Sequence, residues 1–339
     1  MRRLIPLLAL LWLAACSEPA TDQLFVYSAR HYDSDHRLYE AFTAQTGIQV
    51  RVLQGGSDEL IERMSREGIA SPADILITVD AGRLWRAEQA AVLQPVSSEL
   101  LEERIPLHLR HPEGLWYGFS QRLRVIFYDP AKVDPSEVSR YEDLASSELV
   151  GRVCVRSSNN IYNQSLLASL VSHFGADAAT AWAAGLVANL ARTPQGGDTD
   201  QVLGVASGEC ELALANHYYY IRLAQSQEPE RRAAAQRVGI IFPNQADRGV
   251  HVNVGGAAMA RHAPNRDNAL QFLEFLASDE AQTLFALGNH EYPVVAGIEI
   301  ELDPMLVAWG DLVLDDLNVA ELGVRNPEAV RIADRVGWR

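Results

Sequence analysis

The sequence lacks the short motifs that mark the common hydrolases and nucleotide-binding enzymes. G-x-S-x-G, H-E-x-x-H and G-x-x-x-x-G-K-[ST] are all absent from the 339 residues. Internal repeats and low-complexity tracts are absent too. Histidines occur without the spacing of metal ligands, and we expect the following to lie in the core or at the surface: His108, His111, His173, His251, His262 and His290. With no nucleophile–base pair in view, these absences argue against an enzyme.

The chain also has no excess of basic over acidic residues. The chain carries 29 Lys and Arg against 44 Asp and Glu, a formal net charge of −15. A nucleic-acid partner calls for a basic face, so this balance argues against one. A hydrophobic content of 48% and a charged content of 22% are typical of a globular protein, and the length allows two domains.

Long apolar runs are absent, and the short one at the N-terminus does not reach the length of a membrane span. MRRLIPLLALLWLAAC begins with two arginines and continues with ten mostly apolar residues, which predicts a signal peptide over residues 1–15. The ending Leu13-Ala14-Ala15-Cys16 resembles a bacterial lipobox, so we expect a lipid on Cys16, a tether over 16–23 and a periplasmic protein anchored to a bacterial membrane. The alternative is a chance cysteine behind an ordinary signal peptide.

Cysteine is scarce, with three in the whole chain. If Cys16 carries lipid, Cys154 and Cys210 remain as one pair in an oxidising compartment, where disulfides persist. Both are flanked by short strand-like segments, so a disulfide between neighbouring strands is predicted. Two buried free thiols are the alternative reading. Neither cysteine has the spacing of a zinc motif.

Apolar segments and helical patterns alternate along the chain, which is typical of α/β proteins with a largely parallel sheet. We expect strands at 24–27, 48–53 and 74–79, helices at 35–46, 58–67 and 82–90, and a second α/β set from 141 to about 235. One helical stretch is expected at 266–287. The glycine pairs Gly196-Gly197 and Gly255-Gly256 are interpreted as turns.

Two long extended segments, 118–128 and 238–243, separate the α/β sets. Two α/β lobes joined by two extended crossings resemble the periplasmic binding-protein architecture, which closes around its ligand by a hinge. We therefore predict a first lobe of 24–121 plus 244–339 and a second lobe of 122–243. A single continuous α/β enzyme domain is the alternative.

Tyrosines stand where strands are expected to end and helices to begin. Tyr32 follows the strand at 24–27, Tyr162 follows the strand-like Val153-Cys154-Val155, and Tyr218-Tyr219-Tyr220 follow Leu212–Ala215. Open α/β sheets bind ligands at the carboxyl ends of their strands. Neighbouring residues on a strand point to opposite faces, whereas at the start of a helix they can converge.

Phenol oxygens suit one kind of ligand in particular. The pKa of a free phenol is near 10, so a phenol ligates well when a strong Lewis acid removes its proton. Hard cations prefer oxygen donors, and calcium and magnesium favour carboxylates and carbonyls, so a cluster of tyrosines points to ferric iron. The three-tyrosine run taken alone also fits an aromatic packing patch or a pocket for a sugar or an aromatic amine.

Four segments carry a family resemblance: YSARHYDSD, DELIERMSREGIASPADILITVDAGRLWRAE, RSSNNIYNQSL and LANHYYYIRLA. They resemble, in order and spacing, the ferric-iron-binding proteins of bacterial ABC importers, in particular the tyrosine-rich branch that includes the cyanobacterial iron-uptake binding proteins. The resemblance covers about residues 24 to 300. It implies a monomer that carries Fe(III) as cargo to an inner-membrane permease without catalysis, with a site formed by His31, Tyr32, Tyr162, Tyr218 and Tyr219, and with Tyr220 outside it.

Another branch of that family has a glutamate ligand where Val79 aligns here, so a carboxylate ligand at that place is not expected. Four phenolates around one ferric ion leave one negative charge, which is costly to bury unpaired. Arg122 on the first crossing and Arg222, four residues after Tyr218, are placed to compensate it, although both could instead be surface residues. Thiamine, a polyamine or a phosphonate is the alternative cargo, since a tyrosine cage can hold an ammonium group by cation–π contacts.

Overall fold

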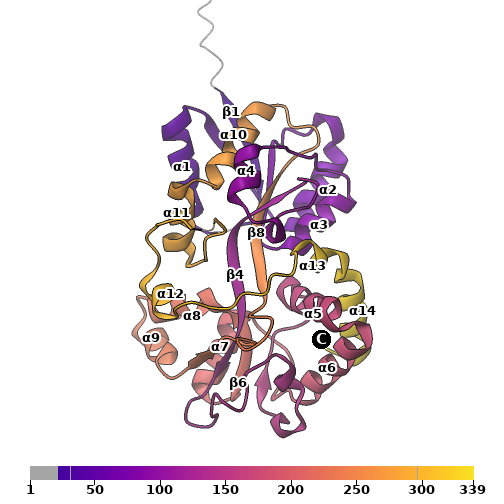
Figure 1. Cartoon of the computed structure of the whole chain (residues 1–339), viewed down its shortest axis with the longest axis vertical. Coiled ribbons are helices and arrows are strands. Elements are labelled where there is room, and N and C mark those ends of the chain that lie inside the picture. Colours follow the sequence, from indigo (N-terminus) through magenta and orange to yellow (C-terminus); the bar gives the residue numbers. More distant parts are fainter. Residues whose placement is uncertain (1–21, 31, 296) are drawn as a thin grey trace, which may run out of the picture.

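A computed structural model describes residues 22–30, 32–295 and 297–339. One sheet with the strand order β2-β1-β3-β8-β4-β6-β5 runs through two lobes, and β7 pairs with β4 beside this path (Figure 1). The strands are β1 (Gln23–Ser28), β2 (Gln49–Gln54), β3 (Ile75–Thr78), β4 (Tyr117–Tyr128), β5 (Val153–Cys154), β6 (Leu212–Asn216), β7 (Gly239–Ile241) and β8 (Val252–Met259). The predicted two-lobed α/β fold is confirmed.

The first lobe contains the parallel strands β1, β2 and β3. Its helices are α1 (Asp35–Thr46), α2 (Ser57–Glu67), α3 (Ala81–Gln89), α4 (Glu99–Arg104), α10 (Arg266–Leu276) and α11 (Asp279–Asn289), with 3-10 turns at Gly68–Ala70 and Leu107–Leu109. The single helix predicted for 266–287 is wrong. The Ser278 hydroxyl accepts a hydrogen bond from the N–H of Ala281, 3.2 Å away, and so caps a new helix there.

The two crossings between the lobes are β4 and β8, which lie side by side and antiparallel (Figure 1). The prediction of a second crossing at 238–243 is wrong, because this segment contains β7, which pairs with Ile126–Tyr128 of β4. The prediction that Gly255-Gly256 form a turn is wrong, because both residues lie inside β8. A Cβ atom on Gly256 would stand 2.7 Å from the carbonyl oxygen of Tyr117, and one on Gly255 would stand 2.7 Å from Arg30 Nη1. These glycines therefore let side chains and backbone approach the crossing closely.

The second lobe places β5 and β6 in parallel, so that their carboxyl ends reach the same edge of the sheet. Cys154 follows Val153 in β5, and the chain then passes through residues 155–160 to Tyr162, whereas β6 leads directly into Tyr218. The helices of this lobe are α5 (Ile161–Phe174), α6 (Ala176–Ala188), α7 (Asp198–Ser207), α8 (His217–Ala224) and α9 (Pro229–Ala235), with 3-10 turns at Glu142–Ala145 and Ser147–Leu149.

The C-terminal segment does not stay with the first lobe as predicted. It contains α12 (Pro304–Ala308), α13 (Ala320–Val324) and α14 (Asn326–Val336). Helix α13 packs against α3 of the first lobe and α5 of the second, and α14 packs against α5 and α6 (Figure 1). The amphipathic α14 buries Ile332 and its neighbours, and Trp338 stacks edge-on to Trp182. Assigning all of 244–339 to the first lobe was therefore wrong for these helices.

The signal peptide and Cys16 fall within residues 1–21, outside the described residues. Because β1 begins at Gln23, the predicted tether of 16–23 is one residue too long. Among residues 22–30, 32–295 and 297–339, no helix combines the length and the apolar character that crossing a membrane requires.

Candidate functional site

Tyr218 and Tyr219 occupy the first turn of α8. Their ring centroids lie 4.4 Å apart, and Tyr218 is fully buried while Tyr219 is half-buried. The residue before the helix, Asn216, has its side chain turned back toward the sheet, where its Nδ2 donates to the Tyr218 hydroxyl at 3.4 Å. The start of the helix thus directs two consecutive phenols to one place.

Tyr162 and Tyr32 reach the same place from other strand ends. Asn160 caps α5 by accepting a hydrogen bond from the N–H of Tyr162 at 3.0 Å, which fixes this tyrosine in the first turn. Tyr32 comes from the loop between β1 and α1 of the opposite lobe. The phenol groups of Tyr32, Tyr162, Tyr218 and Tyr219 are close enough to influence one another electrostatically. The structure thus brings together four of the five predicted site residues, and His31 lies outside the described residues.

The environment of Tyr162, Tyr218 and Tyr219 raises the pKa of each phenol. Burial, followed by the proximity of the other tyrosines, raises the pKa of Tyr162 and of Tyr218. Burial and the nearby carboxylate of Asp198 raise the pKa of Tyr219. In such a setting a phenol becomes anionic when a strong Lewis acid replaces its proton.

Arg222 lies over three of the four rings of the tyrosine cluster. Its guanidinium carbon is 4.6 Å from the ring centroid of Tyr32, 4.9 Å from that of Tyr218 and 5.7 Å from that of Tyr219. Because Tyr32 belongs to the first lobe and Arg222 to the second, these contacts mean that the lobes are closed over the site. Within the described parts of the chain, Arg222 forms no ion pair with a carboxylate, so its positive charge is directed at the tyrosines.

Arg122 is also beside the cluster, but its charge is balanced within the protein. Its Nε lies 2.7 Å from Oε1 of the buried Glu291, whose Oε2 is 3.2 Å from Nη1 of Arg30. Arg30 in turn pairs with Asp35 at 2.9 Å. Burial would raise the pKa of Glu291, but Arg122 and Arg30 outweigh it and lower that pKa to about 2. The two arginines and two carboxylates are thus neutral together, whereas Arg222 has no carboxylate partner among the residues that the structure describes.

Val79 and Asp80 follow β3, at the place that aligns with a glutamate ligand of another branch of the family. The carbonyl oxygen of Val79 accepts a hydrogen bond from Arg122. The next residue, Asp80, caps α3 by accepting from the N–H of Gly82 at 2.7 Å, and it also accepts from the Ser165 hydroxyl at 2.9 Å. Burial raises the pKa of Asp80 to about 6, although these two hydrogen bonds act to lower it. Across residues 22–30, 32–295 and 297–339, no group of three or more His, Cys, Asp or Glu side chains could hold a metal ion.

Tyr220 and His217 flank the two central tyrosines and play other parts. Tyr220 stacks on Phe127 at 5.9 Å, away from the other phenols. His217 is buried, and its Nδ1 accepts from the N–H of Leu123 at 3.1 Å while its Nε2 donates to the carbonyl oxygen of His290 at 2.8 Å. Burial lowers the pKa of His217 to about 4, so this imidazole is neutral.

Sequence reasoning missed Arg30, Glu291, Arg124 and Asp198, all of which are buried beside the tyrosine-bearing loops. Arg122 and Arg124 stand two apart in a strand of otherwise mostly apolar or aromatic residues, a spacing that places both on one face. That spacing was a usable signal for Arg124. No local signal marks Glu291, because its partners Arg30 and Arg122 lie 261 and 169 residues away in the chain.

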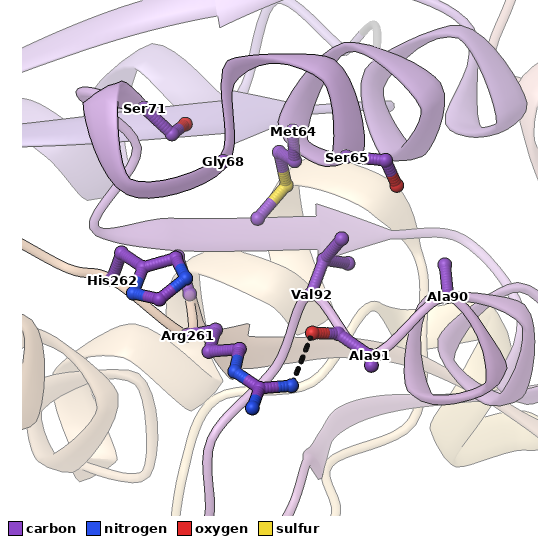
Figure 2. Close-up of a pocket in the computed structure, with 10 residues that line it drawn as sticks. Met64, Ser65, Gly68, Ser71, Ala90, Ala91, Val92, Arg261 and His262 are labelled. Atoms are coloured by element: carbon purple, nitrogen blue, oxygen red, sulfur yellow. Dashed lines mark hydrogen bonds between the residues drawn. The ribbon is translucent and has the colours of Figure 1, made fainter.

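A surface cavity of about 280 Å³ lies in the first lobe, away from the tyrosines (Figure 2). Met64, Ser71, Val92 and His262 are among its lining residues. Ser71 precedes β3 and His262 follows β8, so the cavity is at the end of these strands opposite to the loop that holds Val79. No tyrosine is among its lining residues, and the tyrosine cluster remains the candidate functional site.

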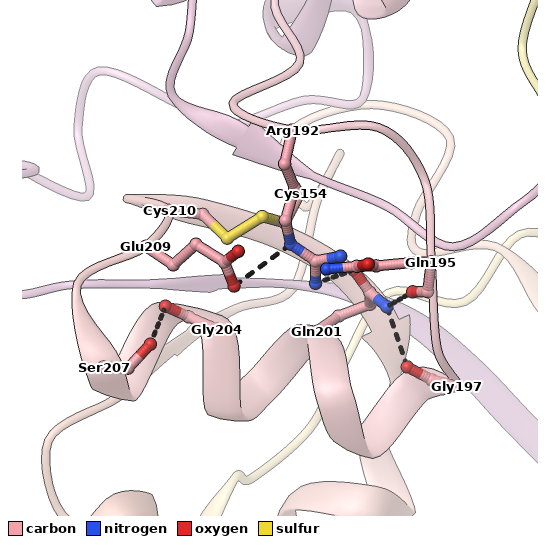
Figure 3. Close-up of a disulfide and its surroundings, with 9 residues drawn as sticks. All are labelled: Cys154, Arg192, Gln195, Gly197, Gln201, Gly204, Ser207, Glu209 and Cys210. Carbon is pink, nitrogen blue, oxygen red and sulfur yellow. Dashed lines mark hydrogen bonds and ion pairs between the residues drawn. A yellow bond between two sulfur atoms is a disulfide. The ribbon is translucent and has the colours of Figure 1, made fainter.

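The Cys154–Cys210 disulfide is present, with the two Cα atoms 5.8 Å apart (Figure 3). It joins β5 to the segment just before β6, the two strands that lead to Tyr162 and Tyr218. Both cysteines are buried, and Arg192 and Glu209 form an ion pair beside them at 3.1 Å. The disulfide therefore ties together the bases of two tyrosine-bearing segments.

Two α/β lobes closed over a buried group of side chains define a solute-binding protein. The chain belongs to the bacterial extracellular solute-binding proteins, because the sequence model of that family matches residues 37–305. It is 49% identical to Iron uptake protein A1 and 50% identical to Iron uptake protein A2, both from Synechocystis sp. These alignments cover 94% and 93% of this chain, and 88% and 89% of the two relatives.

A solved structure shows the same fold. It is Trichodesmium IdiA (FutA) in complex with iron and citrate ligands, with a TM-score of 0.90 and 50% sequence identity. The similarity covers 94% of this chain and all of that one (100%). The similarity therefore extends over both lobes.

Proposed function

We propose that this protein is the substrate-binding subunit of a bacterial ABC importer, and that it binds ferric iron between its lobes through tyrosine phenolates. The observation that carries the proposal is the convergence of four phenols from two lobes on one place beside the guanidinium of Arg222. The names of its relatives, which are iron uptake proteins, support the same cargo. The protein delivers its cargo without transforming it.

The proposed ligands are Tyr32 from the first lobe and Tyr162, Tyr218 and Tyr219 from the second, with His31 as a further ligand beside Tyr32. Hard trivalent cations favour anionic oxygen donors, and the N-termini of α5 and α8 favour negative charge on the phenols of their first turns. Arg222 then offsets the single negative charge that four phenolates leave around Fe(III). Arg122, held by Glu291, lines the same site.

The closed position of the lobes fits a carrier that encloses its cargo and opens by a hinge. The proposed hinge lies near Arg122 on β4 and near Asn253 on β8, which pair with each other, and α13 contacts both lobes. We further propose that the protein is a monomer, that Cys16 carries a lipid which anchors it in the periplasm, and that an inner-membrane permease receives the iron. Finding the mature protein in the aqueous rather than the membrane fraction of cells would contradict the anchor.

An organic ammonium cargo is less well supported. Such a group would need the faces of the tyrosine rings for cation–π contacts. Arg222 already lies over the rings of Tyr32, Tyr218 and Tyr219. A second cation at those faces would be repelled by the guanidinium, whereas phenolate oxygens bound to iron would be attracted to it.

Addition of ferric iron to the iron-free protein tests the proposal. Phenolate ligands should produce a visible charge-transfer band, which an organic cargo cannot produce. Tyr218→Phe and Tyr219→Phe should weaken or abolish the band and the binding. Tyr220→Phe is the matched control, because Tyr220 packs on Phe127 instead, and it should leave both unchanged. The absence of any band in the unmodified protein would refute the proposal.

A further inference from the structure

The two tyrosine-bearing helices of the second lobe are connected beneath the phenols by a buried ion pair. Arg124 of β4 and Asp198 at the start of α7 are each 1% exposed, and Arg124 Nη1 lies 2.7 Å from Asp198 Oδ2. We infer that this pair positions Tyr162 relative to Tyr218 and Tyr219, and so sets the geometry of the second-lobe half of the iron site. The inference rests on the proposed function and adds two positioning residues to it.

One arm of Arg124 reaches the helix that carries Tyr162. Its Nη2 donates to Oδ1 of Asn163, the next residue in α5, at 2.6 Å. The Nδ2 of Asn163 donates in turn to the carbonyl oxygen of Arg156 at 2.9 Å, in the loop that leads into α5. The first turn of α5 and its preceding loop are therefore held by one guanidinium through one amide.

The other arm reaches the helix that carries Tyr218 and Tyr219. Arg124 Nη1 donates to Oδ1 of Asn216 at 3.0 Å, and Asp198 Oδ2 accepts from the backbone N–H of the same asparagine at 2.8 Å. Asn216 immediately precedes α8, and its Nδ2 contacts the Tyr218 hydroxyl. Asp198 also pairs with Nη1 of Arg156 at 3.2 Å, which links this arm back to the loop before α5.

The chemistry of the pair suits a positioning role. A guanidinium is planar and presents its donors in a fixed fork, so the two asparagines it holds have a defined separation. A lysine ammonium at the same position keeps the charge facing Asp198 but cannot reach both asparagines in this geometry. Residues that hold metal ligands in place alter metal affinity about 10- to 100-fold when they are changed.

Arg124→Lys in the full-length protein is the direct test, and three measurements are made on it: the thermal melting curve, the affinity for ferric iron by chelator competition, and the visible charge-transfer band. We expect a folded protein whose iron affinity falls about 10- to 100-fold and whose band is weaker or shifted. Arg152→Lys is the matched control. Arg152 pairs with Glu211, and these residues directly precede β5 and β6, at the ends of the two strands that are remote from the tyrosines. This change should therefore leave the iron affinity and the band unchanged.

Asn163→Ala is the second variant, because it cuts the arm to α5 and leaves the ion pair in place. We expect a smaller loss of affinity in the same direction. If Arg124→Lys fails to fold, Asn163→Ala becomes the test of the inference. An unchanged band and an unchanged iron affinity in the Asn163→Ala protein would then overturn the inference. A folded Arg124→Lys protein with a lower melting temperature but unchanged band and affinity would also overturn it. If the unmodified protein shows no band at all, it is the proposed function that fails.

Discussion

Iron binding should weaken by about a thousandfold or more for each unit by which the pH is lowered, because the ligands must lose protons to bind. Burial raises the pKa of Tyr162, Tyr218 and Tyr219, so these phenols are protonated at neutral pH. Each one that binds iron as phenolate releases a proton. Three such ligands give a slope of three between the logarithm of the apparent affinity and pH, and each further ligand that releases a proton on binding raises the slope by one.

The corresponding free energy is about 4 to 5.5 kcal/mol per pH unit, at about 1.4 kcal/mol for each tenfold change in affinity. Lower pH returns protons to the phenols and disfavours binding, so the slope is positive. Competition with a chelator of known proton uptake measures it between about pH 6 and about pH 7. Tyr219→Phe should reduce the slope by one, while Tyr220→Phe should not change it. A slope below one, or equal slopes in both variants, would refute the reasoning.

Three further predictions concern the surroundings of the tyrosines. Arg222→Leu should lower iron affinity about 10- to 100-fold while the charge-transfer band remains, since the cation offsets charge and is not a ligand; loss of the band would contradict this. Glu291→Gln should destabilise the fold by about 3 kcal/mol at neutral pH, because two buried arginines lose their partner. Denaturation at several pH values should show this difference shrinking as the pH falls from about 4.5 to about 2, where wild-type Glu291 itself takes up a proton. Replacing Cys154 and Cys210 together by serine should cost roughly 4 kcal/mol in urea denaturation, and an unchanged midpoint would mean that the disulfide does not form.

The positions of the proposed ligands could be predicted because they depend on local patterns. Apolar segments followed by polar residues mark the ends of β1, β5 and β6, and the tyrosines stand just beyond them. Tyr220 could be separated from Tyr218 and Tyr219 by the resemblance to iron-binding proteins. In the structure Tyr220 stacks on Phe127.

The parts that escaped prediction depend on contacts between distant segments. Glu291 is recognisable as a partner of Arg122 only when the chain has folded, because 169 residues separate them. Gly255 looks like a turn residue in the sequence, yet it lies in β8, where Arg30 approaches the strand too closely for a side chain. Helix α14 shows an apolar face, but its sequence does not say which lobe will cover it.

Diffraction from crystals of the iron-loaded protein, recorded at the absorption edge of iron, would test the central claim most directly. The account predicts one strong anomalous peak between the lobes, within bonding distance of the hydroxyl oxygens of Tyr32, Tyr162, Tyr218 and Tyr219 and next to the guanidinium of Arg222. An iron peak elsewhere, or one bound by carboxylates while these phenols stay free, would contradict it.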